Sequence, residues 1–162
     1  MEPESPAKRE MLRHTVATLA YRGGKALRGA PAGFAEFKAS PTTRTPGEIL
    51  AHIGDLLDWG LALAQGRHEW RPLPPRTWDE DVGRFHAGLA AFDAYLASNA
   101  PLLSPVEGLF QGPVADALNH VGQINMLRRM AGSPVKGENY FKARILAGHV
   151  GAEQSAPRVE FD

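Results

Sequence analysis

Three polar side chains in residues 116–130, DALNHVGQINMLRRM, have the types and spacing expected of a metal or hydrogen-bonding site. On a helix that turns by about 100° per residue, Asp116, His120 and Gln123 fall within roughly 60° of arc. The neighbouring Ile124 and Leu127 predict that this face packs into a core. A buried carboxylate without a partner costs several kcal/mol, so Asp116 is expected to meet a cation there.

A third ligand is predicted from an earlier helix, ILAHIGDLLDWGLALAQG, which ends at Gly66. Thr45 and Glu48 form a capping-box pattern at its start, with Pro46 between them in the first turn. Its inward stripe, at spacings of three and four, is expected to be Ile49, His52, Leu56, Trp59 and Leu63.

His52 lies in the middle of that stripe, and Asp116 and His120 are four residues apart on theirs. Residues at positions i and i+4 can share one metal because their Cβ atoms are about 5–6 Å apart. His52, Asp116 and His120 would together form a set of two imidazoles and one carboxylate that leaves positions open for water or substrate.

A structural explanation of the same residues stays open. Asp116 and His120 could form a buried hydrogen-bonded pair, and His52 could be an ordinary core histidine, because an Asp and a His at this spacing often occur by chance. The placement of all three on apolar stripes favours the metal site.

Further residues are candidates for supporting roles. Gln123 is about 10 Å along the helix axis from Asp116, so we expect it to contact a ligand residue or substrate rather than the metal. Asn119 could orient a ligand through a hydrogen bond. His149 could reach the site as a fourth ligand or proton shuttle. Of the other histidines, His86 is expected at the edge of its helix stripe, half exposed.

No general base can be identified from the sequence. Asp55, Asp58 and Glu107 are possible, although acidic residues on helices and loops are usually solvated.

The other predicted elements complete an all-α fold. A first helix is expected over residues 6–28 with Ser5 as N-cap, a third starts at the capping box of Thr77 and Glu80, and a fourth covers residues 113–131. The run ENYFKARILAG is expected to form a short fifth helix that ends at Gly148, followed by an irregular tail at 151–162. These patterns predict one four-helix bundle domain over residues 1–162.

Composition excludes several classes of protein. Lys plus Arg and Asp plus Glu both number 18, and no basic block stands out, so nucleic acid is not an expected partner. The absence of cysteine removes disulfides and thiolate ligands, and fits a cytoplasmic location. Neither a signal peptide nor an uncharged apolar run of membrane-spanning length is seen, so no membrane partner is expected.

The ligand pattern resembles the DinB/YfiT-like family of metalloenzymes. His52 in LAHIGDLLDW and the run NHVGQINMLRRMAGSPV carry the resemblance, which spans about residues 12–150. The most specific piece is His120 to Gln123 followed by LRR. Asp116 departs from the histidine usual at that ligand position. The resemblance implies an up-down-down-up four-helix bundle, a divalent metal such as zinc, nickel or iron, and a homodimer.

Two chemistries follow for a small-molecule substrate if the metal binds. A bound water could be activated for hydrolysis, with its pKa lowered towards about 7. The resemblance also implies a second route, in which a low-molecular-weight thiol cosubstrate attacks an electrophile. The alternative is a non-catalytic, stress-related bundle that holds a metal or ligand.

Overall fold

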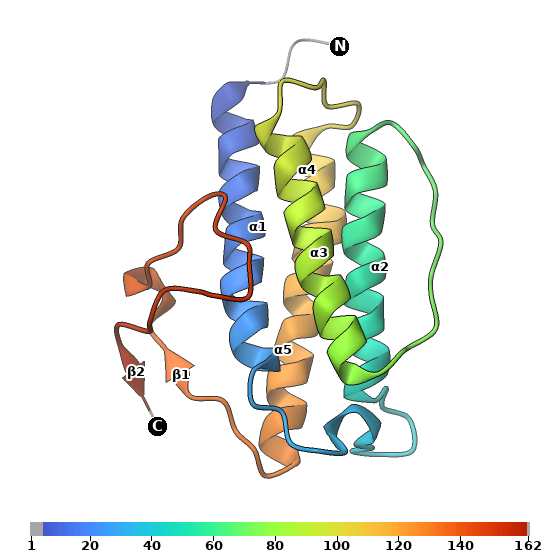
Figure 1. Ribbon diagram of the computed structural model, residues 1–162, viewed down its shortest axis with the longest axis vertical. Coiled ribbons are helices and arrows are strands. Elements are labelled where there is room, and N and C mark those ends of the chain that lie inside the picture. The colour runs from blue at the N-terminus through green and yellow to red at the C-terminus, as the bar shows by residue number, and fades with distance from the viewer. Residues whose placement is uncertain (1–4, 162) are drawn as a thin grey trace.

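The computed structural model describes residues 5–161 as a bundle of long helices with a small C-terminal extension (Figure 1). The helices are α1 (Pro6–Leu27), η1 (Phe34–Glu36), α2 (Pro46–Ala64), α3 (Trp78–Ala97), α4 (Val106–Leu109), the π-helical turn η2 (Phe110–Val114), α5 (Ala115–Met130) and η3 (Tyr140–Lys142). Two short strands, β1 (Gly137–Glu138) and β2 (Glu160–Phe161), follow α5.

Side-chain caps fix where α2 and α3 begin. In both helices the predicted capping box is confirmed: the Thr45 and Thr77 hydroxyls accept the backbone N–H of Glu48 and Glu80, whose carboxylates accept in return from the threonine N–H. Ser5 is the N-cap residue of α1, but its side chain makes no capping hydrogen bond. The polar start signals of α2 and α3 are therefore satisfied locally, before any packing is considered.

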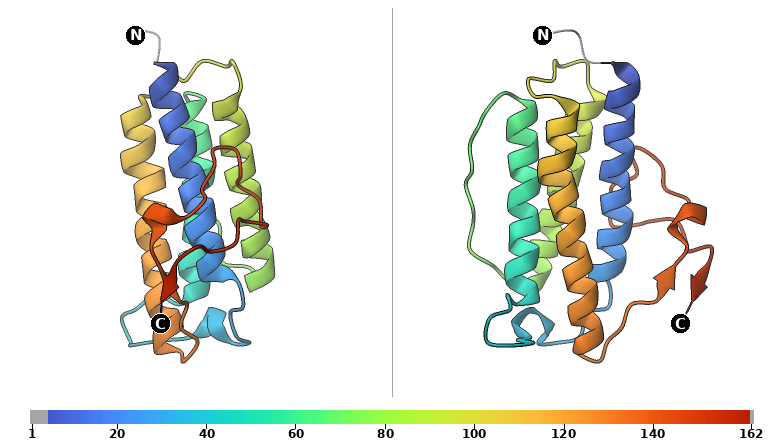
Figure 2. Two further views of the ribbon diagram at one scale, coloured as in Figure 1. Left: turned by 90° about the vertical axis from the view of Figure 1, so that its left-hand side faces the viewer. Right: turned by 180° about the vertical axis from the view of Figure 1, so that it is seen from behind.

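The four long helices form a closed ring in which α2 packs on α3 and α5, and α1 packs on the same two helices. From its N-terminus α1 runs down the bundle in Figure 1, α2 and α3 both run up, and α4 to α5 run down. Because α2 and α3 are parallel, the connector at 65–77 has to return along the whole length of the bundle. Figure 2 shows the same connector on the outer side of α2.

Apolar residues from all four helices fill the centre of this ring. The largest side chains with almost no exposed surface include Leu12, Leu19, Leu50, Ile53, Leu57, Phe85, Leu89, Phe92, Leu109 and Ile124. None of the helices within residues 5–161 is long and apolar enough to cross a membrane.

The last helix begins earlier than the sequence predicts. A connector was expected up to Gly112, yet the chain is helical from Val106, and Pro113 lies inside the π-helical turn η2. A proline ring clashes with the preceding turn of an α-helix, and a single π-helical turn relieves that crowding. The helix therefore continues through Pro113 into α5, one turn before Asp116.

The prediction of a fifth helix is wrong. Only the three residues of η3 are helical there, and Gly137 and Glu138 pair in antiparallel register with Phe161 and Glu160. Part of the tail expected to be irregular is therefore a strand. The extension lies along the outer side of α1 (Figures 1 and 2), where the buried Lys25 ammonium donates to Glu138 at 2.8 Å and to Glu160 at 2.9 Å.

Candidate metal centre

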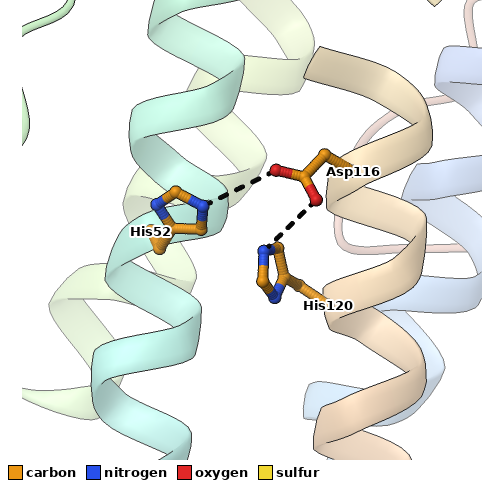
Figure 3. Close-up of side chains that lie close together, drawn as sticks. All are labelled: His52, Asp116 and His120. Carbon is orange, nitrogen blue, oxygen red and sulfur yellow. Dashed lines mark ion pairs between the residues drawn. The ribbon is translucent and has the colours of Figure 1, made fainter. Parts of the chain in front are cut away.

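His52, Asp116 and His120 come together between α2 and α5 (Figure 3). One ligand atom from each residue lies within 4.8 Å of the other two. Asp116 bridges the histidines: its Oδ2 lies 3.7 Å from His52 Nε2, and its Oδ1 lies 3.5 Å from His120 Nε2. Two ligands at about 2.1 Å from a tetrahedral metal are about 3.4 Å apart, so the three side chains would have to move slightly closer together to share one ion.

The cluster is shallower than the sequence predicts. The Asp116 side chain is 45% exposed, His52 is 23% exposed and His120 is 13% exposed, whereas the core face of α5 is made by other residues such as Ala117 and Ile124. Asp116 therefore does not carry the cost of full burial that first suggested a cation. The three donors lie close to the surface, and two of them, His52 and His120, also line a cavity.

Close packing of α2 against the start of α5 helps to set this distance. Gly60 lies against Pro113, and a Cβ atom at position 60 would come within 3.2 Å of the proline ring. The two helices run in opposite directions, and His52 on α2 faces Asp116 and His120, which lie within two turns of the π-helical turn. The local geometry at Pro113 thus positions the helix that carries two of the three donors.

A neighbouring amide orients His120. Gln123 Oε1 lies 2.8 Å from His120 Nδ1, so Nδ1 donates its hydrogen to the amide when the imidazole is neutral. That tautomer leaves the lone pair of Nε2 free, on the atom that faces Asp116. Ligand histidines in metal sites are commonly held this way by a hydrogen bond from the other ring nitrogen.

Two rings and an arginine lie near His52. Its imidazole makes edge contacts with Trp70 and with His120, at centroid distances of 5.7 Å and 4.7 Å. Burial lowers the pKa of His52 from 6.5, and His120 and Arg44 lower it further, while Asp116 opposes the shift. The neutral imidazole, which is the form that binds metals, is therefore favoured.

A cavity of about 600 Å³ opens beside the two histidines. Its lining contains His52, His120, Gln123, Ile49, Met126, Leu127, Met130 and the 39–44 loop residues Ala39, Ser40, Thr43 and Arg44. Sequence reasoning missed Arg44 and the loop, because nothing in a loop sequence shows which helix faces it will cover. Met126 and Met130 could have been found from their spacing beside Gln123.

Two candidates for supporting roles lie elsewhere. Asn119 is exposed beside Asp116, in a separate hollow with Trp59, and its side chain makes no hydrogen bond within residues 5–161. His149 is exposed in the C-terminal extension, next to Gly148, which lies against Arg13. That extension runs along α1, away from the groove between α2 and α5 (Figure 2).

The candidate general bases are engaged elsewhere. Asp55 is buried, contrary to expectation, and accepts from Arg84 and from the Leu73 N–H. Asp58 also pairs with Arg84, and Glu107 pairs with Lys8. Within residues 5–161, no acidic side chain lines the cavity.

The sequence and the structure were compared with known proteins. No protein-family model, curated protein or solved structure matches the chain.

Proposed function

We propose that this protein is a divalent-metal-dependent enzyme that acts on a small molecule, with His52, Asp116 and His120 as the metal ligands. The observation that carries the proposal is the meeting of three donor atoms within 4.8 Å at the edge of a cavity of about 600 Å³. Pockets of this volume are typical of small-molecule sites. A divalent ion bound there would supply Lewis acidity to a molecule in the cavity.

The chain direction supports a DinB-like assignment. The four long helices run down, up, up and down in Figure 1. Seen from the other end of the bundle, this is the up-down-down-up order that the resemblance implies. The position of His52 on one helix and His120 on a facing one agrees with it. The assignment carries a homodimer with it as part of the proposal.

The lining of the cavity favours thiol transfer over hydrolysis. In zinc peptidases a glutamate beside the metal acts as general base on the bound water, whereas a thiol, with an ordinary pKa of about 8.5, loses its proton to solvent near neutral pH. The described part of the chain places no acidic side chain in the cavity that could act as that base. The chain also has no cysteine, so the thiol would arrive as a cosubstrate.

Turnover tests this function. Protein purified without a histidine tag and loaded with zinc, nickel or iron would be assayed with a thiol plus a panel of electrophiles, and with a panel of esters and amides. We expect thiol-dependent product formation that His52→Ala abolishes and His68→Ala, in the exposed connector, leaves unchanged.

Metal retention without turnover in either panel would favour the non-catalytic alternative. One observation favours that alternative over hydrolysis: Asp55, Asp58 and Glu107 are all engaged in ion pairs outside the cavity.

A further inference from the structure

We infer that the cavity beside His52 and His120 binds a small monoanionic amphiphile, a carboxylate carried on an alkyl or aryl body, with the carboxylate against Arg44. Calling this molecule the substrate rests on the proposed function, but its binding does not require the metal. The inference follows from the unequal distribution of charge and apolar surface around the cavity.

One wall of the cavity is apolar and adaptable. Met126 and Met130 are 60% and 56% exposed, an unusual exposure for side chains of this kind, and both line the cavity beside the buried Ile49 and Leu127. Methionine side chains are flexible and polarisable, and they are common where a surface accepts apolar groups of varying shape. This wall fits an alkyl chain or an aromatic ring.

A loop residue supplies a positive charge to the same cavity. Arg44 is the one charged residue among those that line the cavity in the described part of the chain, and it is exposed. No ion pair is formed by its guanidinium within residues 5–161, although it lies near enough to Glu48 to lower that carboxyl pKa. The Glu48 carboxylate is itself held by the Thr45 N–H in the capping box. The guanidinium is therefore free to bind a carboxylate, which matches its planar fork.

The remaining polar groups set the ligand's charge. The other polar side chains of the lining outside the histidine pair, Ser40, Thr43 and Gln123, are neutral. A cationic ligand would meet Arg44 without a compensating carboxylate in the lining. A neutral apolar molecule would make no use of the Arg44 guanidinium. A single negative charge at one end of an apolar body satisfies both walls.

Methyl resonances of the methionines offer a test with an internal control. In protein labelled at the methionine methyl carbon, octanoate would be titrated into the metal-free and the zinc-loaded protein at about pH 8, with 1-octanol and acetate as matched probes that lack the charge or the tail. Met126→Leu and Met130→Leu assign the signals. Met11 lies on the other side of the bundle, on α1, and reports binding elsewhere.

We expect octanoate to shift the Met126 and Met130 methyl signals and not that of Met11. Arg44→Gln should weaken octanoate binding on the order of tenfold, whereas Arg129→Gln, an exposed arginine outside the cavity, should not. The inference is overturned if 1-octanol binds as tightly as octanoate, if Arg44→Gln has no effect, or if Met11 shifts equally. Octanoate binding in a protein that takes up no metal would support this inference and contradict the proposed enzyme.

Discussion

Gln123 holds the imidazole of His120 through a 2.8 Å hydrogen bond between Oε1 and Nδ1. The two residues are one turn apart on α5, so the bond forms within a single helix and needs no other element. It orients the ring so that Nε2 faces Asp116 at 3.5 Å. The helix that supplies two ligands thus also fixes the orientation of one of them.

Removal of that amide should weaken metal binding without unfolding the protein. We expect Gln123→Leu to lower zinc affinity by about 10- to 100-fold, because His120 loses the partner that sets its tautomer and orientation. Asn119→Leu is the matched control: Asn119 is also exposed on α5, but its side chain makes no hydrogen bond in the described chain. Calorimetric zinc titration of both variants measures the difference. An equal loss in both, or none in either, would show that Gln123 has no such role.

Arg128 should be far more important for stability than its neighbour Arg129. The buried Arg128 guanidinium donates to the carbonyls of Ala26, Arg28, Gly29 and Ser133, which joins the end of α1 to the end of α5. Replacement by methionine would leave these carbonyls without their donor, so the free energy of unfolding should fall by about 2–4 kcal/mol. Arg129 is exposed, and Arg129→Met should change it by less than about 0.5 kcal/mol. Urea denaturation of the two variants tests this, and similar stabilities would contradict it.

Two glycine-to-alanine substitutions should change the stability of the protein in opposite directions. A Cβ atom at Gly23 would lie 2.5 Å from the Phe85 ring, where α1 packs on α3, so Gly23→Ala should destabilise the protein by about 1–3 kcal/mol. At Gly83, on the exposed side of α3, a Cβ atom would meet nothing within 4 Å. Gly83→Ala should therefore stabilise by about 0.5–1 kcal/mol through helix propensity. Thermal melts measure the stability of both variants. A change in the same direction in both would contradict the packing of α1 on α3.

Stability should fall on mild acidification, in part because of His86. Burial lowers the pKa of His86 from 6.5, and Arg28 lowers it further, while the Val150 backbone opposes the shift. Between the lowered pKa and 6.5 the unfolded chain binds a proton that the folded chain does not, so the folded state loses stability as pH falls through that window. His86→Gln should therefore lose less stability than the wild type between about pH 8 and pH 5. Denaturation curves at both pH values check this, and equal losses would rule it out.

Local signals made much of the fold predictable. The two capping boxes give the starts of α2 and α3, because those hydrogen bonds are made within four residues of chain. The spacing of Asp116 and His120, and the place of His52 in its stripe, led to the prediction that the three would meet, and they do. Metal binding itself stays a prediction.

The errors arose where the outcome depends on distant parts of the chain. Pro113 looked like a helix boundary, and a π-helical turn that accommodates it has no sequence signal. The strand at Gly137 and Glu138 depends on a partner more than 20 residues away. Asp55 is buried because Arg84 of α3 meets it.

Zinc titration of the ligand variants tests the central claim most directly. Tag-free protein would be stripped of metal, and zinc binding measured by calorimetry for the wild type, for His52→Ala, Asp116→Ala and His120→Ala, and for His68→Ala as a control outside the groove. The structure predicts one ion per chain, with affinity reduced on the order of 100-fold or more in each ligand variant and unchanged in the control. Wild-type affinity in all three ligand variants would mean that these side chains hold no metal.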